Sequence, residues 1–166
     1  PVVNTNPRND VFGFAIRDLE FAAKYLPVTA NQAGRLTKWS AFGMLSRVYL
    51  SYSGISANPN SGLRNETYLD LAKKAAKKVC DESGLKLLDK YADLFKIENN
   101  NNSESLFSLQ WVPNGDFGVN NTQQAYFACS SDITGDDAAW GYYTMASFDM
   151  MSEYEVPDSL RRKATF

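Results

Sequence analysis

Histidine is absent from this sequence of 166 residues, and its absence excludes several classes of enzyme site. Without an imidazole there can be no Ser-His-Asp triad, no Cys-His nucleophile pair and no His-ligated zinc. Cysteine is scarce as well, because the chain holds only Cys80 and Cys129, which lack the spacing of metal ligands. We expect Cys80, on an apolar helix face, to be a buried thiol. The pair leaves the redox compartment open.

Long apolar runs and a strong net charge are also missing. No stretch approaches the roughly 20 apolar residues of a membrane-spanning helix, and no basic-then-apolar leader opens the sequence. The net charge of −2 provides no general attraction to nucleic acid or to an anionic membrane. Because the sequence starts at Pro1 rather than Met, we expect it to be an excised or processed piece of a longer chain.

Helical periodicity dominates the regular part of the sequence. Residues 38–52 are apolar over most of a helix circumference, which predicts a central helix covered on several sides. Thr37 is its expected N-cap, and Gly54 is expected just past its end in the left-handed conformation. Three of its aromatic side chains are expected in the core: Trp39, Phe42 and Tyr49.

Further helices are expected on both sides of this one. Residues 11–25 form the first, with Asp10 as the N-cap, and shorter helices are expected at 90–97 and 146–154. Residues 66–82 form the third, between a cap at Asn65 or Thr67 and a stop at Gly84. Its apolar face comprises Tyr68, Ala72, Ala75, Ala76, Val79 and Cys80. Its four lysines fit a solvated face better than a phosphate-binding surface.

The rest of the sequence is irregular. Residues 104–111 are expected to be a short extended segment. Residues 112–143 mix Gly, Asn, Asp and Ser with aromatic residues and show no periodicity. Long loops on a helical scaffold often carry function. The prediction is therefore an all-α fold with little β structure and a long irregular loop that presents the ligand contacts.

Four segments resemble the SusD/RagB family of nutrient-binding lipoproteins of the Gram-negative outer membrane. The first is GRLTKWSA at residues 34–41, which runs into LSRVYL at 45–50. The second comprises YLDLA at 68–72, GLKL at 84–87 and YADLF at 91–95. The third is NSESLFSLQ at 102–110, and the fourth is Asp158, Arg161 and the final Thr165-Phe166. They occur in the family's order and cover residues 34–166.

The resemblance implies a fold of tetratricopeptide-like helix pairs, with residues 1–166 as one helical domain taken from a longer chain. It also implies binding of a glycan or another nutrient oligomer at the cell surface, for carbohydrate uptake and polysaccharide utilisation. The implied partner is a TonB-dependent (SusC-like) outer-membrane transporter. Membrane association would use a lipid anchor outside this segment. The family performs no chemistry on its ligand, so we expect neither a catalytic residue nor a cofactor.

Sugars are bound by flat aromatic faces, while amide and carboxylate groups pair with their hydroxyls, and the long loop is rich in both. Trp140 is the preferred stacking platform. The other predicted binding residues are Tyr126, Phe117, Tyr142, Trp111, Asn120, Gln123 and Asp136. The alternative is that these aromatic side chains pack the loop onto the helices.

Two further readings of the loop remain open. Asp132, Asp136 and Asp137 could hold calcium or act as the paired carboxylates of a glycoside hydrolase. Their spacing does not fit an EF-hand loop, and turn-forming or capping roles are favoured. The main alternative to a glycan-binding protein is a helix-repeat scaffold whose loop aromatics bind protein or peptide.

Overall fold

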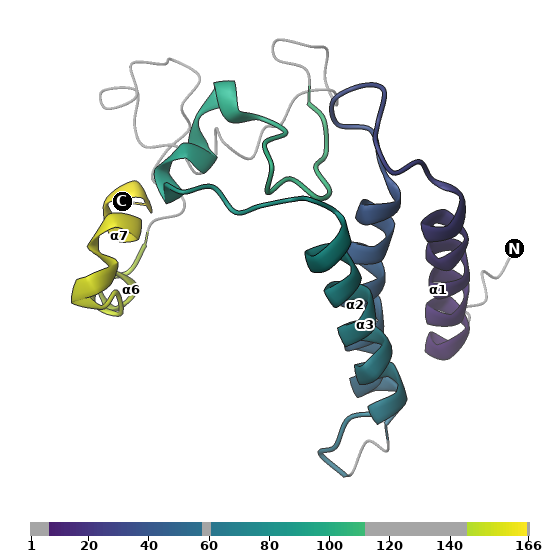
Figure 1. Cartoon of the computed structure of the whole chain (residues 1–166). Helices are drawn as coiled ribbons and strands as arrows, with labels where there is room; N and C mark the ends of the chain where they lie inside the picture. The colour runs from purple at the N-terminus through teal and green to yellow at the C-terminus, as the bar shows by residue number, and fades with distance from the viewer. Residues whose placement is uncertain (1–6, 58–60, 112–145, 166) are drawn as a thin grey trace, which may run out of the picture. The chain divides into compact units, whose positions relative to one another are not determined.

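The computed structural model describes residues 7–57, 61–111 and 146–165. Every regular element in these ranges is a helix (Figure 1), which confirms the predicted all-α class. The elements are α1 (Arg8–Tyr25), α2 (Lys38–Ile55), α3 (Glu66–Glu82), η1 (Tyr91–Phe95), η2 (Ile97–Asn99), α6 (Phe148–Ser152), η3 (Val156–Asp158) and α7 (Ser159–Thr165). None of these helices combines the length and apolar content needed to cross a bilayer.

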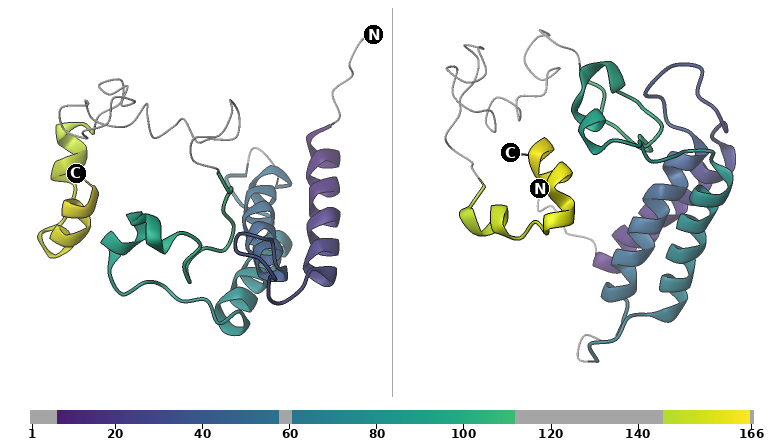
Figure 2. Two further views of the ribbon diagram at one scale, coloured as in Figure 1. Left: turned by 90° about the horizontal axis from the view of Figure 1, so that it is seen from above. Right: turned by 60° about the vertical axis from the view of Figure 1, so that its left-hand side comes forward.

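The chain divides into two compact units. The first comprises Pro1–Leu88 and Glu98–Ser108, and the second comprises Asp89–Ile97 and Leu109–Phe166. In the first unit α2 packs against both α1 and α3, and successive helices run antiparallel (Figures 1 and 2). The predicted central position of α2 is therefore confirmed.

The core of the first unit is built from all three helices. Its buried residues are Ile16 and Ala23 of α1, Ala41, Leu45 and Tyr49 of α2, and Ala72 and Ala75 of α3. The two alanines of α3 leave room for the backbone of α2 to approach closely, because the distance between packed helices depends on the side chains at their contact. Trp39 and Tyr49 are buried as expected, whereas Phe42 is only partly buried.

Aromatic rings link the three helices in sequence. Phe12 of α1 stacks on Tyr52 of α2 with ring centroids 5.3 Å apart. Tyr52 in turn meets Tyr68 of α3 edge to face at 4.6 Å, and Tyr49 lies 6.2 Å from the same ring. Such offset and edge-to-face pairs stabilise more than their buried area alone. These four aromatic side chains therefore help to pack the three helices together.

The start of α1 and the end of α2 differ from the prediction. Helix α1 begins at Arg8, because the carbonyl of Pro7 accepts from the N–H groups of Asp10 and Val11. Asp10 lies in the first turn, where its negative charge complements the helix dipole. The prediction that Gly54 follows the end of α2 in the left-handed conformation is wrong, because α2 continues to Ile55.

Contacts from the following segment explain why α2 continues. The guanidinium of Arg64 donates to the carbonyl of Leu50 at 3.3 Å, and the N–H of Asn65 donates to the carbonyl of Ser53 at 2.8 Å. Ser53 is completely buried beneath these contacts. Carbonyls of the last turns thus find partners beyond the helix, and no glycine is needed to end it at residue 54.

Helix α3 has the predicted bounds. Asn65 caps it by accepting from the N–H of Thr67 at 3.1 Å, and Gly84 follows its end at a φ of +73°. The expected burial of Cys80 is wrong, because its side chain is exposed. The buried stripe follows Ala72, Ala75 and the adjoining turns, and Cys80 lies outside that stripe.

The lysines of α3 form exposed ion pairs along the helix. Lys74 pairs with Asp70, Lys77 with Asp81 and Lys78 with Glu82, at 2.6, 2.6 and 3.1 Å. Each pair is spaced by four residues, so it lies along one helix face. Local pairing with carboxylates fits the solvated face that was favoured over a phosphate-binding surface.

The remaining elements are shorter than expected. The short helix expected at 90–97 is a 3₁₀ helix over Tyr91–Phe95, and the helix expected at 146–154 spans only Phe148–Ser152. Residues 104–111 contain no strand. The closing helix α7, which sequence reasoning missed, packs against η1 within the second unit.

Candidate ligand-binding segment and its support

Trp111 lies in the second unit at the end of the described range 61–111. Its side chain is 46% exposed, so part of the indole remains available to a ligand. The other predicted binding residues lie outside the described residues: Tyr126, Phe117, Tyr142, Trp140, Asn120, Gln123 and Asp136. The candidate calcium residues Asp132 and Asp137 lie outside them too. Of the predicted binding residues, the structure therefore describes Trp111, which directly precedes the loop at 112–143.

The segment ahead of Trp111 is apolar and exposed. Phe107 is 47% exposed and Leu109 is 69% exposed, although both residue types are usually buried. An exposed aromatic or aliphatic side chain can lie against the apolar face of a sugar ring. Phe107 was not among the predicted binding residues, because its place in the NSESLFSLQ segment indicated a structural role.

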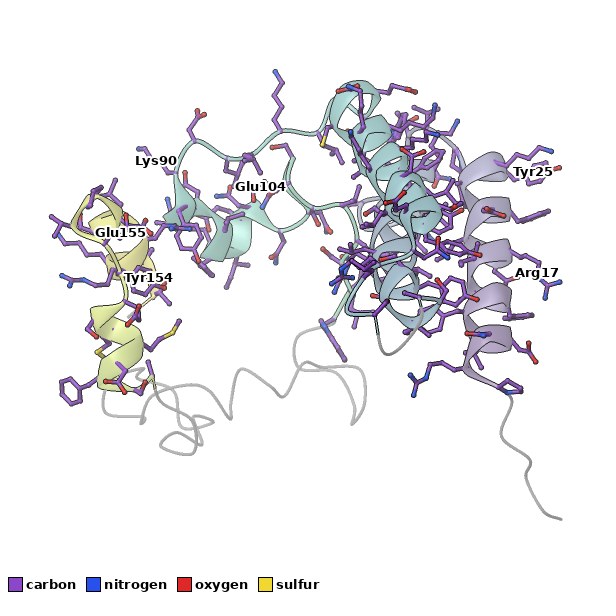
Figure 3. The ribbon with its side chains drawn as sticks, turned by 90° about the horizontal axis from the view of Figure 1, so that it is seen from below. Arg17, Tyr25, Lys90, Glu104, Tyr154 and Glu155 are labelled. Atoms are coloured by element: carbon purple, nitrogen blue, oxygen red, sulfur yellow. The ribbon has the colours of Figure 1, made fainter. Side chains whose placement is uncertain are left out.

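Residues 103 and 104, which precede this segment, are hydrogen-bonded to the residues that follow α3 in the first unit. The N–H of Lys86 donates to the carbonyl of Ser103 at 3.1 Å, and the Ser103 hydroxyl donates back to the Lys86 carbonyl at 2.9 Å. The N–H of Leu88 donates to Oε1 of Glu104 at 2.7 Å. Figure 3 labels Glu104 on this part of the ribbon. Three hydrogen bonds thus join residues 86–88 to residues 103–104.

Residues 101–105 form a turn, and this turn contains Ser103 and Glu104. Asn101 has a φ of +58°, a conformation that asparagine tolerates better than most residues. The amide oxygen of Asn102 accepts from the N–H of Glu104 at 2.8 Å, and the Asn102 carbonyl accepts from the N–H of Ser105 at 2.9 Å. Asparagine side chains commonly stabilise turns in this way.

In the second unit, the polar groups form local ion pairs. Arg161 donates two hydrogen bonds to Asp158, and this contact holds the pKa of the Asp158 carboxyl below its usual value. Lys96 lies 2.7 Å from Asp93 and lowers the pKa of that carboxyl likewise. Both carboxyl groups therefore stay ionised to a lower pH than an unpaired aspartate does.

Helix η1 of the second unit carries two aromatic rings that contact each other. Tyr91 and Phe95 meet edge to face with ring centroids 5.3 Å apart. Phe95 remains 62% exposed and Tyr91 37% exposed. Helix η1 packs against α7, which carries Arg161. The YADLF segment, which forms η1, therefore packs against the helix that carries Arg161.

The described part of the first unit is thus built from antiparallel helices, and comparison with known proteins shows what the chain is similar to. The chain is 45% identical over all 166 residues to a SusD-like protein of Bacteroides ovatus. No model of a protein family matches it. The 166 residues of this chain span 30% of the length of the Bacteroides ovatus protein. The resemblance to SusD-like proteins is confirmed along the whole chain.

Two crystal structures share the fold. Each matches the whole chain with 44% identity and a TM-score of 0.89. The chain covers 33% of the protein in one of them, which was determined with a xylogluco-oligosaccharide, and 32% in the other. The chain therefore spans about one third of the proteins that it matches, and it has the SusD-like all-α fold over that part.

Proposed function

We propose that this chain is part of a glycan-binding protein of the bacterial outer membrane. The observation that carries the proposal is the likeness to a protein crystallised with a xylogluco-oligosaccharide, at 44% identity and a TM-score of 0.89 over the whole chain. Similarity at this level supports a shared backbone over the matched residues. A xyloglucan-type oligosaccharide is therefore the first ligand to test.

The proposal extends to the role of the longer protein. It is a surface-exposed lipoprotein, anchored through a lipid outside this segment, and delivers its glycan to a TonB-dependent (SusC-like) transporter without chemical change. Residues 1–166 form a single helical domain of it, with residues 112–143 as a loop insertion. The likeness to a SusD-like protein over the whole chain supports this reading.

Aromatic side chains of the loop are proposed to bind the glycan. Trp140 is the main platform, and Trp111 stacks at the start of the loop. The remaining contacts are assigned to Tyr126, Phe117, Tyr142, Asn120, Gln123 and Asp136. Exposure of nearly half of the Trp111 side chain supports its place in the set, because a buried indole could not stack on a sugar.

Affinity electrophoresis in gels containing xyloglucan tests the proposal. Wild-type chain should be retarded, and Trp140→Ala should abolish the retardation while circular dichroism stays unchanged. Phe21→Ala is the matched control, because Phe21 is an aromatic residue of α1 that is 66% exposed and lies outside the proposed site. It should migrate like the wild type.

Other outcomes would overturn the proposal. Migration that is unaffected by xyloglucan and by a panel of other polysaccharides, together with retention on a protein partner, would favour the helix-repeat scaffold. Release of reducing ends from the polysaccharide by purified protein would identify a glycoside hydrolase instead.

A further inference from the structure

Glu104 makes a hydrogen bond to a residue far away in the sequence, and its position in the sequence does not predict this contact. It is an acidic residue that is only partly exposed, and its Oε1 accepts the N–H of Leu88 from 16 residues away in the sequence. The side chain of Asn102 orients it by accepting its backbone N–H. The side chain of Glu104 thus fixes the backbone of a residue that lies far from it along the chain.

Ser103 and Glu104 together close the excursion that follows α3. The chain leaves the first unit after Leu88 and returns to it at Glu98. The two hydrogen bonds between Lys86 and Ser103 and the bond between Leu88 and Glu104 join the outgoing and returning parts of the chain. We call this set of three hydrogen bonds the clamp.

Leu106, two residues after Glu104, packs on α2. Its side chain lies so close to Gly43 that a Cβ at position 43 would overlap it. Gly43 therefore leaves a seat for Leu106 on the helix surface. Clamp and seat hold residues 103–106 from two sides, by hydrogen bonds to the segment after α3 and by packing on α2.

We infer that Glu104 is a positioning residue, which holds residues 103–106 in place and thereby sets where the segment leading to Trp111 begins. This inference rests on the proposed function only in assigning Trp111 to glycan binding. Glu104 acts as a hydrogen-bond acceptor, so its acceptor oxygen is required and its charge is not.

Glutamine at position 104 separates the negative charge of the side chain from its ability to accept a hydrogen bond. Glu104→Gln removes the charge and keeps an oxygen that accepts from Leu88, whereas Glu104→Ala removes both. Glu98→Ala is the matched control, because Glu98 is an exposed glutamate at the point where the chain returns to the first unit. Ser103→Ala removes one clamp hydrogen bond and leaves the backbone bond from Lys86 to Ser103.

Two measurements on the whole chain test the inference. Amide hydrogen exchange of Leu88 should be about tenfold faster in Glu104→Ala than in the wild type, since the lost bond contributes to the free energy of local opening. Retention in xyloglucan gels should fall in Glu104→Ala, and remain within about twofold of wild type in Glu104→Gln and Glu98→Ala. Circular dichroism checks that each variant is folded, and Glu104→Gln supplies the test where Glu104→Ala does not fold.

The outcomes separate this inference from the proposed function. Unchanged exchange at Leu88 in Glu104→Ala would overturn the clamp, whatever the gels show. Loss of retention in Glu104→Gln with normal Leu88 exchange would show that the charge itself is needed, which also overturns the inference. If the wild type binds no glycan, the proposed function fails, and the exchange of Leu88 alone decides whether Glu104 positions the segment.

Discussion

The hydroxyl of Tyr49 donates a hydrogen bond of 2.6 Å to Oε1 of Glu20, which links α2 to α1. Tyr49 is 5% exposed, so its phenol group has left bulk water and depends on this acceptor. Burial raises the pKa of Tyr49, and the hydrogen bond to Glu20 and the negative charge of that carboxylate raise it further. The contact joins two helices of the core through a partly buried hydrogen bond.

Tyr49→Phe tests the contribution of this bond. The variant keeps the ring in the core and removes the donor, leaving Glu20 to be solvated by water. We expect the free energy of unfolding to fall by about 1 kcal/mol, the usual size of a hydrogen bond in a protein. Urea denaturation measures it, and an unchanged midpoint would show that the bond contributes nothing.

The raised pKa of Tyr49 predicts a loss of stability in alkali. An unfolded tyrosine ionises near its model value of 10.0, whereas the folded Tyr49 ionises at a higher pH. Between these values the unfolded state releases a proton that the folded state keeps, so the free energy of unfolding falls as the pH rises. Below pH 10 the contribution is fully present.

Tyr49→Phe supplies the comparison for this pH dependence. Thermal unfolding should be followed from about pH 8 to pH 11, across the range in which unperturbed tyrosines begin to ionise. The wild type should lose stability above pH 10 more steeply than the variant. Parallel profiles of the two proteins would contradict the assignment of the effect to Tyr49.

Core and surface apolar residues should respond differently to truncation. Leu45 is 3% exposed in the core of the first unit, and Leu45→Ala should lower the free energy of unfolding by about 2–5 kcal/mol through lost burial and a cavity. Phe21→Ala removes a larger side chain that is 66% exposed. It should change stability by less than about 1 kcal/mol, and an equal loss in both variants would contradict the observed core.

Local sequence signals predicted much of this fold, and contacts between distant residues account for the main errors. Asn65 and Gly84 act on their own helix ends, so the bounds of α3 were correct. The end of α2 depends on Arg64 and Asn65, which approach it from beyond a turn. The error at Cys80 has a different cause, because a small shift in the phase of an apolar stripe moves a residue from the buried face to the exposed one.

The candidate site could be predicted only in outline. Aromatic and amide side chains in a non-periodic stretch indicate what a loop can bind, but they do not fix where each side chain lies. The role of Glu104 was missed for a related reason. Its segment was recognised as a family feature, yet its partner Leu88 lies on a different stretch of chain, and no periodic pattern connects the two residues.

Gly43→Ala tests the seat of Leu106 on α2. In an isolated helix the change to alanine would be stabilising by about 1 kcal/mol, but here the new Cβ would overlap Leu106. We therefore expect a loss of about 1–3 kcal/mol, as for other overpacked contacts. Combining it with Leu106→Ala should remove the overlap, so the double variant should be more stable than the sum of the two single effects predicts. Strict additivity in chemical denaturation would show that Leu106 does not occupy this seat.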